Sequence, residues 1–332
     1  MLTTRIGDLV TSRIALGAWA IGGGSFWGDN DDERSIKAIR TAVDGGITLI
    51  DTAPAYGFGH SEEVLGKAVK GIRDKVKLST KGGLVWSPAE GALFFESDGI
   101  KVYRNNSKTS LTKEVEDSLH RLDTDYIDIY FIHWPALPDF PTPVSETMET
   151  LLKLKEQGKI LAIGISNTSP ENLSEYLDIG KVDLVQEKFS IISRQAMETL
   201  GEVLKSNDVV FQTYSPLESG LLTNKLARDY IPPAGSAREF NDAWFEQKRF
   251  GIALDMLEKW RPLCEKYEAT TGQLAIAWTV TLGDRVSVLI GARTAEQVES
   301  NLKGAEIVLE NEDIAFLTNT ADEAIARAAS IS

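Results

Sequence analysis

Short apolar runs rich in β-branched residues alternate along most of the chain with segments whose apolar positions recur every three or four residues. This alternation predicts successive strand–helix units. Several of the runs are apolar without interruption, as expected for parallel strands that are covered on both faces. The runs that we interpret as strands are Ile14–Leu16, Thr48–Ala53, Val76–Lys81, Tyr126–Trp134, Ile160–Asn167, Leu184–Ser190, Val209–Leu217 and Val286–Ala292.

The segments between these runs have the ends and the apolar stripes of helices. Asp31 and Asp32 are suited to cap a helix that continues to Asp44, and the pair Gly45-Gly46 is suited to end it. Eight units of roughly 30–40 residues favour a closed (β/α)8 TIM barrel, with an open, doubly wound α/β sheet as the alternative. The other predicted helices begin at Ser61 or cover Leu111–Leu122, Val144–Gln157, Pro170–Leu177, Ala196–Lys205 and Thr294–Leu302.

Three segments interrupt this rhythm. Residues 82–108 lack helical periodicity and hold Trp86 and Phe94 among other aromatic residues, which indicates a long loop that covers a site. Residues 224–249 are rich in proline, glycine and charge and form a second long loop, whereas residues 311–332 look like a helical extension that packs outside the barrel or frays. Because barrels of this size commonly form one domain, we predict a single domain over residues 1–332.

The charge balance narrows the set of partners. The 332 residues include 49 acidic and 35 basic ones, and the formal net charge of −14 opposes binding to nucleic acid or to an anionic membrane. No stretch approaches the ~20 apolar residues of a membrane helix, and we expect no secretory signal, since the N-terminus lacks a basic region followed by an apolar run. Cys264 is the only cysteine, so an intrachain disulfide is impossible and a reducing cytoplasm is the expected location. The oligomeric state stays open.

The ends of the predicted strands hold the candidate chemistry, because the active site of such a barrel lies at the C-terminal face. Four polar residues lie at or just beyond such ends: Asp51, Tyr56, Lys81 and His133. Each alone has an ordinary explanation, such as a turn cap, a cover for apolar surface, a solvated charge or a satisfied core histidine. Together they form a coherent proton-donating unit, because a phenol with a pKa of about 10 is a poor acid unless a cation favours its anion.

Within this unit the roles follow from charge. Lys81 supplies the cation, and Asp51 is the carboxylate available to keep that lysine charged away from water. His133 is suited to hydrogen-bond a substrate oxygen.

Other chemistries find less support in the sequence. The chain contains no G-x-G-x-x-G motif, so we do not expect a Rossmann dinucleotide site. With three histidines, one cysteine and no H-E-x-x-H motif, no metal site is predicted. Residues 164–168 are similar to a nucleophile elbow but lack its final glycine, which disfavours a serine hydrolase.

Blocks of sequence that occur together in one enzyme superfamily are spaced along this chain in the same order. They are Leu49–Gly57, Ser61–Glu63, Leu65-Gly66, Ser79–Lys81, Leu119–Leu122, Asp125–Asp128, Ile132–Trp134, Gly158–Ile160, Ile163–Asn167, Tyr214–Leu217, Ser219–Leu222, Ile290–Arg293 and Glu296-Gln297. The chain thereby resembles the aldo-keto reductase superfamily over roughly residues 10–305. It is most similar to the bacterial general-stress and inositol-cluster type reductases, near the potassium-channel β-subunit branch.

The resemblance implies that the chain reduces aldehydes and ketones to alcohols with NADPH. Tyr56 is then the general acid, and Asp51, Lys81 and His133 complete a catalytic tetrad. Aromatic side chains would shape the pocket for a small carbonyl substrate and favour aldehydes with apolar bodies. The implied pocket residues are Trp19, Trp27, Tyr56, Trp86, His133 and Trp134.

The resemblance also implies a cofactor site along the barrel mouth. Arg238 and Arg293 offer guanidinium forks for a 2′-phosphate, which favours NADPH over NADH. Ser300 stands where some relatives have an acidic residue near the adenine. The residues implied at the nicotinamide end are Ala18, Trp19, Asp51, Ser166, Asn167, Gln186 and Tyr214. Those implied at the pyrophosphate and the adenosine are Ser215, Pro216, Leu217, Ser219, Gly220, Leu221, Lys225, Arg238, Gly291, Arg293, Gln297 and Asn301.

Two other functions stay open at this point. The first is an NADPH-binding, redox-sensing module with slow turnover that regulates a partner, which the likeness to the channel β-subunit branch suggests. The second is a barrel hydrolase with paired carboxylates, for which Asp51 and Glu187 are the available pair.

Overall fold

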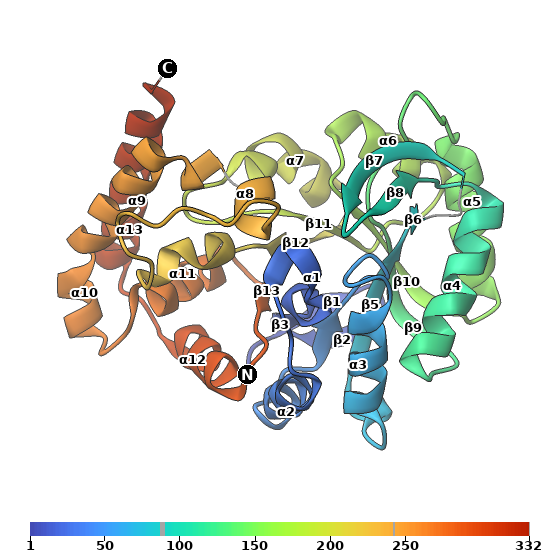
Figure 1. The fold of residues 1–332 in the computed structure, drawn as a ribbon, viewed down its shortest axis with the longest axis horizontal. Coiled ribbons are helices and arrows are strands. Elements are labelled where there is room, and N and C mark those ends of the chain that lie inside the picture. Colours follow the sequence, from blue (N-terminus) through green and yellow to red (C-terminus); the bar gives the residue numbers. More distant parts are fainter. Residues whose placement is uncertain (87–89, 242, 332) are drawn as a thin grey trace.

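The computed structural model describes residues 1–86, 90–241 and 243–331, whose architecture Figure 1 shows. Eight parallel strands close into a barrel in the order β10-β11-β12-β13-β3-β4-β5-β9. Each overlaps one of the runs predicted from the sequence, so the (β/α)8 TIM barrel is confirmed. The strands are β3 (Ile14–Gly17), β4 (Leu49–Asp51), β5 (Lys77–Gly82), β9 (Ile127–Ile132), β10 (Ile160–Ser166), β11 (Leu184–Lys188), β12 (Val210–Tyr214) and β13 (Val286–Gly291).

Helices follow the strands and cover the outside of the barrel. Outward-facing strand residues such as Ile50 pack with helix residues such as Ile39 and Leu65 in one large apolar cluster. Inward-facing residues such as Leu49 and Phe131 form a separate cluster inside the barrel. The helices of this layer are α2 (Asp32–Asp44), α3 (His60–Val69), α4 (Lys108–Leu122), α5 (Val144–Glu156), α6 (Pro170–Ile179), α7 (Gln195–Ser206), α11 (Thr271–Val280) and α12 (Ala295–Glu306).

Residues next to the helices determine where the helices begin and end. The Asp31 side chain accepts a hydrogen bond from the backbone of Arg34 and caps α2, as predicted, and Gly45 ends that helix. The helix predicted to open at Ser61 begins one residue earlier, after Gly59 in the left-handed conformation.

An N-terminal hairpin, which the strand count from the sequence omits, precedes the barrel. It consists of β1 (Thr3–Ile6) and β2 (Leu9–Ser12), paired antiparallel. Ile6 is fully buried in the interior cluster with Leu49 and Phe131, so the hairpin contributes to the core of the barrel.

The segment 82–108 is mostly a small antiparallel sheet rather than the expected irregular loop. Its strands β6 (Leu84–Trp86), β7 (Ala92–Ser97) and β8 (Ile100–Arg104) pair in the order β6-β8-β7. Asp98 and Gly99 join β7 to β8 with φ angles of 53° and 73°. An Asp-Gly pair between apolar runs is a strong signal for a hairpin turn. The hairpin was therefore predictable from this pair, although the segment lacks regular alternation.

The second predicted loop, residues 224–249, also holds short helices: α8 (Ala237–Asn241), η4 (Ala243–Phe245) and the start of α9 (Gln247–Lys259). After it come α10 (Arg261–Lys266) and, at the C-terminus, α13 (Asn311–Ala329). Figure 1 shows α9, α10 and α13 gathered on one side of the barrel, away from the hairpin β7–β8. The remaining short elements are η1 (Trp19–Gly22), α1 (Gly24–Trp27), η2 (Arg73–Lys75) and η3 (Glu218–Thr223).

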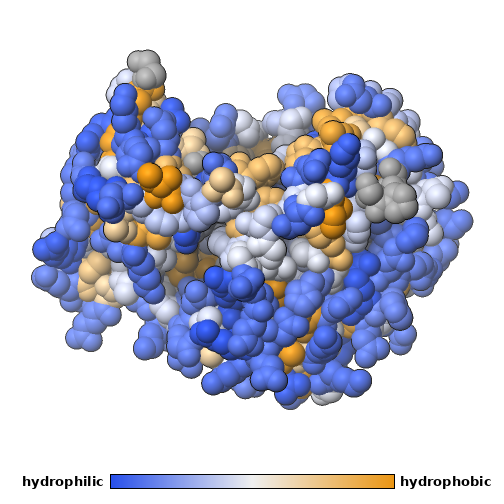
Figure 2. Space-filling view, viewed as in Figure 1, coloured by the Kyte–Doolittle hydropathy of each residue, from blue (hydrophilic) through white to orange (hydrophobic). Residues whose placement is uncertain are grey.

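The C-terminal helix packs on the molecule. The indole N–H groups of Trp260 and Trp278 donate to the Thr320 and Thr318 hydroxyls of α13 at 2.8 and 2.9 Å. Of the two expected outcomes for this segment, packing and fraying, the structure shows packing for residues 311–329. Figure 2 shows that hydrophilic residues dominate the periphery of the molecule on the face displayed, whereas apolar residues gather nearer its middle.

Candidate active site

The four side chains of the predicted proton-donating unit meet at the C-terminal ends of three neighbouring strands, β4, β5 and β9. Lys81 Nζ lies 2.5 Å from Asp51 Oδ1 and 3.1 Å from the Tyr56 hydroxyl oxygen. The same ammonium donates to the carbonyl of Thr52 at 2.8 Å. The His133 ring stands edge-on to the Tyr56 ring, with centroids 5.8 Å apart. The structure therefore brings all four predicted residues together.

Strand alternation explains why these side chains point into the barrel. Every second residue of a strand faces the same side, and Leu49 lies in the interior cluster two positions before Asp51. Likewise Phe131 lies in that cluster two positions before His133. The register of the strands pairs Lys81 with Phe131, and Lys81 Nζ lies 5.9 Å from the Phe131 ring centroid.

Two glycines let the loop that carries Tyr56 approach its neighbour closely. A Cβ atom on Gly57 would lie 2.2 Å from the carbonyl oxygen of Gly22, and one on Gly22 would lie 2.5 Å from the Tyr56 backbone. Gly57 also has a φ of 67°, which favours glycine. Any side chain at either position would push the Tyr56 loop away from η1.

Burial is the largest influence on the ionisation of this cluster. Burial raises the pKa of Tyr56, and the Lys81 charge only partly opposes this. Burial lowers the pKa of Lys81, but attraction to Asp51 and Tyr56 outweighs it, so that pKa is raised. The pKa of His133 lies well below its usual value because of burial and then the charges of Lys81 and Arg104. The effect of Lys81 on the phenol is present as predicted, but in this structure it does not prevail.

A chain of hydrogen bonds across the barrel interior fixes the second oxygen of Asp51. Its Oδ2 accepts from Ser79 Oγ at 2.8 Å and from Gln186 Nε2 at 3.1 Å. Gln186 Nε2 also donates to Gln212 Oε1 at 2.7 Å, and Gln212 Nε2 donates to Ser287 Oγ at 3.0 Å. Both N–H groups of the Gln186 amide are therefore engaged, and its carbonyl oxygen is the atom left for a ligand.

A cavity of about 750 Å³ opens beside this cluster. It contains most of the residues that the sequence assigned to substrate and cofactor. Its lining includes Trp19, Trp27, Asp51, Tyr56, His133, Trp134, Ser166, Asn167, Gln186, Tyr214, Ser215, Pro216, Leu217, Ser219, Gly220, Lys225, Arg238, Gly291, Arg293, Gln297, Ser300 and Asn301.

Three of the predicted contacts lie outside this lining. Ala18 and Leu221 are fully buried in the apolar cluster outside the barrel, so their side chains support the wall and do not face the cavity. The Trp86 ring packs edge-on against Phe58, with centroids 5.5 Å apart. Trp86 therefore lies with a neighbouring loop and not among the pocket residues.

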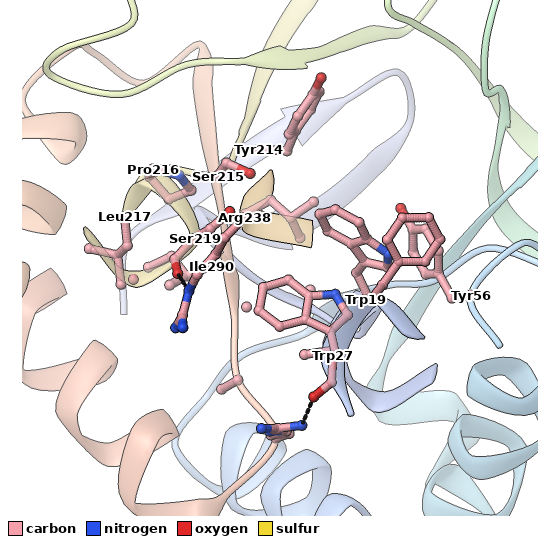
Figure 3. Close-up of a pocket in the computed structure, with 18 of the residues that line it drawn as sticks. Trp19, Trp27, Tyr56, Tyr214, Ser215, Pro216, Leu217, Ser219, Arg238 and Ile290 are labelled. Carbon is pink, nitrogen blue, oxygen red and sulfur yellow. Dashed lines mark hydrogen bonds between the residues drawn. The ribbon is translucent and has the colours of Figure 1, made fainter. Parts of the chain in front are cut away.

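Figure 3 shows the two tryptophans of the cavity together with Tyr56. The Trp19 ring lies between Trp27 and Tyr56, with centroid distances of 5.2 Å to the former and 6.1 Å to the latter. The Trp27 carbonyl accepts a hydrogen bond from Arg293 at 3.0 Å, while Arg238 Nε donates to the Ser219 carbonyl at 3.0 Å. The cavity thus has an aromatic part beside Tyr56 and a cationic part farther along it.

Comparison with known proteins decides the family. The model of the aldo/keto reductase family matches residues 13–322. The chain belongs to the aldo/keto reductase family. It is similar to an NADH-specific methylglyoxal reductase of Escherichia coli, with 44% identity over 95% of this chain and 96% of the relative.

Solved structures of other aldo-keto reductases share the barrel. A glycerol dehydrogenase from Gluconobacter oxydans is 36% identical with a TM-score of 0.84, over 98% of this chain and 95% of that one. An aldo/keto reductase from Klebsiella pneumoniae, solved with NADP and acetate, is 26% identical with a TM-score of 0.71, over 96% and 94% of the two chains. These likenesses support nicotinamide-dependent carbonyl reduction as the class of activity.

The cationic part of the cavity in this aldo-keto reductase suits an anionic ligand. Lys225, Arg238 and Arg293 line it, and none of the three takes part in an ion pair among the described residues. Glu218, Ser219 and Gly220 follow one another in the left-handed conformation with φ angles of 47°, 50° and 93°. The N–H groups of Glu218 and Gly220 donate to the carbonyls of Ser215 and Leu217, so this turn does not present a row of free N–H groups to an anion, and the three cations carry the argument.

The polar groups near Tyr56 suit an amide. The Asn167 side chain donates to the His133 carbonyl at 2.9 Å and accepts from the Tyr214 hydroxyl at 2.8 Å, so its orientation is fixed. Trp27 Nε1 is buried and has no partner within the described residues. The residues present therefore fit a ligand that has an aromatic amide at one end and phosphate groups along its length.

Within the parts of the chain that the structure describes, no group of three or more histidine, cysteine, aspartate or glutamate residues is placed to hold a metal ion. No helix in the same parts is both long enough and apolar enough to cross a membrane.

Proposed function

We propose that this aldo-keto reductase uses NADPH to reduce aldehydes and ketones to alcohols, with Tyr56 as the proton donor. The observation that carries the proposal is the position of Lys81 Nζ, 2.5 Å from Asp51 Oδ1 and 3.1 Å from the Tyr56 hydroxyl. The nicotinamide, when bound, supplies a hydride to the carbonyl carbon. Tyr56 gives its phenolic proton to the carbonyl oxygen, which completes the alcohol.

The charges around Tyr56 support this role. The raised pKa keeps the phenol protonated before reaction, and the Lys81 ammonium stabilises the tyrosinate that forms as the proton leaves. Asp51 holds that ammonium in place and keeps it charged. His133, whose pKa lies well below its usual value, is neutral at neutral pH and can hydrogen-bond the substrate oxygen without competing as an acid.

The cofactor is proposed to lie along the cavity from Tyr56 to Arg293. Ser166, Asn167 and the side-chain amide oxygen of Gln186 would hold the carboxamide. The other predicted residues of the lining would hold the pyrophosphate and the adenosine. Lys225, Arg238 and Arg293 support the phosphorylated cofactor, because none of these cations forms an ion pair with another described residue. Related reductases use either form, so this preference is a point for direct measurement.

The test of the mechanism is Tyr56→Phe, which removes the proton donor and keeps the ring. Turnover of aldehydes should fall by about a hundredfold or more, while the cofactor dissociation constant changes little. The rate of NADPH consumption gives the turnover number, and quenching of tryptophan fluorescence gives the cofactor dissociation constant. Tyr126→Phe controls for the general loss of a hydroxyl, because Tyr126 lies just before the start of β9 and therefore away from the strand ends that hold the site. Unchanged turnover in Tyr56→Phe would remove Tyr56 from the mechanism.

The same titration addresses the cofactor. The wild-type protein should bind NADPH about tenfold or more tightly than NADH, because charge-assisted hydrogen bonds to a phosphate are strong. Equal affinities would disprove the preference and leave the reductase assignment intact. Tight cofactor retention with slow turnover on every aldehyde would instead favour the redox-sensing module.

A further inference from the structure

We infer that Glu187 is a positioning residue for the nicotinamide end of the cofactor, because its carboxylate holds the backbone turn that carries Asn167. The inference rests on the proposed function, in which Asn167 binds the carboxamide of the cofactor. Glu187 lies near the end of β11, next to Gln186. From the sequence it was a candidate only for a carboxylate pair with Asp51, and the proposed reductase mechanism gives it no role.

The Glu187 side chain points away from the barrel interior. Leu184 belongs to the apolar cluster inside the barrel, and Gln186, two positions later, reaches Asp51 there. Val185 belongs to the cluster outside the barrel, so Glu187, two positions after Val185, faces the same outer layer. The carboxylates of Glu187 and Asp51 therefore face opposite sides of the barrel wall, which disfavours the pair that a hydrolase would need.

On that outer side the carboxylate binds the turn that follows β10. Glu187 Oε1 accepts a hydrogen bond from the Thr168 backbone N–H at 2.7 Å. The residue is 8% exposed, and no ion pair among the described residues includes it. Burial raises the pKa of Glu187 to about 7, and the N–H groups of Thr168 and Asn167 act in the opposite direction because they hydrogen-bond the carboxylate. The backbone of this turn is therefore what the buried carboxylate binds.

Asn167 depends on this turn for its orientation. Its φ of 56° lies in the left-handed region, which asparagine tolerates at a cost that its surroundings must offset. Its side chain lines the cavity, donates to the His133 carbonyl at 2.9 Å and accepts from the Tyr214 hydroxyl at 2.8 Å. Because the allowed side-chain directions depend on backbone conformation, a hydrogen bond that fixes the turn also fixes which way this amide faces. Glu187 does not line the cavity itself and acts through a residue that does.

The place of the carboxylate on β11 explains why a buried acceptor is useful here. Water or an exposed side chain could satisfy the Thr168 N–H without the desolvation of a carboxylate. An acceptor on β11 instead ties the turn to the strand that carries Gln186, whose amide oxygen is proposed to bind the same carboxamide. Ser166 Oγ strengthens this link, because it donates to the Gln186 backbone carbonyl at 2.8 Å. Glu187 thus keeps the Asn167 and Gln186 amides in a fixed relation to each other.

The experiment compares two ligands that differ only at the nicotinamide. They are NADPH and 2′-phospho-ADP-ribose, which has the same adenosine end and pyrophosphate but lacks the dihydronicotinamide ring and its carboxamide. Glu187→Leu keeps a side chain of similar size and removes the acceptor. Its dissociation constant for NADPH should rise about threefold to tenfold, while its dissociation constant for 2′-phospho-ADP-ribose should change less than about twofold. Isothermal titration calorimetry measures both ligands.

Matched variants separate positioning from a general loss of structure. Glu187→Gln keeps an oxygen acceptor at the same distance from the backbone, so it should bind NADPH within about twofold of wild type. Glu175→Leu, on the exposed face of α6, controls for the loss of a nearby carboxylate and should change neither affinity. If Glu187→Leu weakened both ligands equally, or neither of them, the positioning role would be overturned.

Failure of this inference and failure of the proposed function give different results. If wild-type protein binds NADPH no more tightly than 2′-phospho-ADP-ribose and reduces no carbonyl compound, the proposed function fails and the inference fails with it. If wild type reduces aldehydes and Glu187→Leu binds both ligands as wild type does, the reductase stands and the positioning role alone fails. Should Glu187→Leu not fold, Glu187→Asp replaces it, because the shorter side chain withdraws the carboxylate from the Thr168 N–H and should give the same selective loss.

Discussion

Burial influences the pKa of several ionisable side chains around the barrel mouth more strongly than their charged neighbours do, whereas at Lys81 attraction to Asp51 and Tyr56 outweighs it. It is the first cause of the raised pKa of Tyr56 and of the lowered pKa of His133. It also raises the pKa of two carboxyls, Glu114 and Glu187, each to about 7. The four residues of the tetrad were predictable from the sequence. The dominance of burial over neighbouring charges in setting the pKa values of Tyr56 and His133 was not, because burial depends on how the chain packs.

Glu114 offers a residue-scale prediction. It is 7% exposed, and its carboxylate accepts from the Gly83 backbone at 2.9 Å and from the Ser110 hydroxyl at 2.8 Å. Between pH 4.5 and about 7 the folded chain binds a proton at Glu114 that the unfolded chain has released, so this group's contribution to stability falls as pH rises through that window. Glu114→Gln does not titrate and so lacks this loss. As pH rises from 4.5 to 8, the free energy of unfolding of the variant minus that of wild type should increase by about 2–3 kcal/mol.

Denaturant unfolding at four or five pH values measures this difference. Glu116→Gln, on the exposed side of the same helix, controls for the loss of one negative charge. A constant difference between Glu114→Gln and wild type across the range would contradict the raised pKa.

At the scale of strands, polar residues inside the barrel connect elements that are far apart in sequence. Ser287 on β13, Gln212 on β12 and Gln186 on β11 form one line of hydrogen bonds that ends on Asp51 of β4. Gln212 and Ser287 are fully buried. Two acceptors, Asp51 and Gln212, hold the N–H groups of the Gln186 amide. This line of hydrogen bonds therefore fixes which end of the amide faces the cavity.

Gln212→Leu should therefore have two effects. It removes one of the two acceptors of the Gln186 amide and the donor to the Ser287 hydroxyl, so the free energy of unfolding should fall by about 1–3 kcal/mol. Held by Asp51 alone, the Gln186 amide is less firmly oriented, and NADPH should bind about threefold to tenfold more weakly. Ser287→Ala, which breaks only the far end of the line, should show a smaller loss of both. A stability loss with unchanged cofactor affinity would restrict Gln212 to a structural role.

The elements were predictable from sequence where periodicity was uninterrupted. The eight barrel strands stand out as apolar runs because both of their faces are covered, and Asp31 with Gly45 marks the ends of α2. The sheet of β6, β7 and β8 did not stand out, because its strands are short and partly exposed and carry aromatic residues on both faces.

At the scale of the whole molecule, α9 and α10 add a second packing layer beside the barrel, and α13 packs against it. No helix was predicted from the sequence between residues 249 and 294, although most of α9 and all of α10 and α11 lie there. In α11 nearly every residue is buried, so it lacks the one-sided stripe by which amphipathic helices are recognised. Its Thr270–Gln273 capping box was the signal available in the sequence.

The contact between this layer and α13 gives a prediction for the molecule as a whole. Trp260 is fully buried, and the hydroxyl of Thr320 is its hydrogen-bond acceptor at 2.8 Å. Thr320→Val keeps the shape of the side chain and removes the acceptor, so the indole N–H stays buried without a partner and the free energy of unfolding should fall by about 1–3 kcal/mol. Thr199→Val, which loses only a hydroxyl bonded to its own exposed helix turn, should change that free energy by less than about 0.5 kcal/mol.

Thermal and denaturant unfolding measure both variants, and equal effects would mean that α13 contributes little to the packing around Trp260. A transition that separates into two steps in Thr320→Val would show instead that the C-terminal layer unfolds apart from the barrel, which a single cooperative fold excludes.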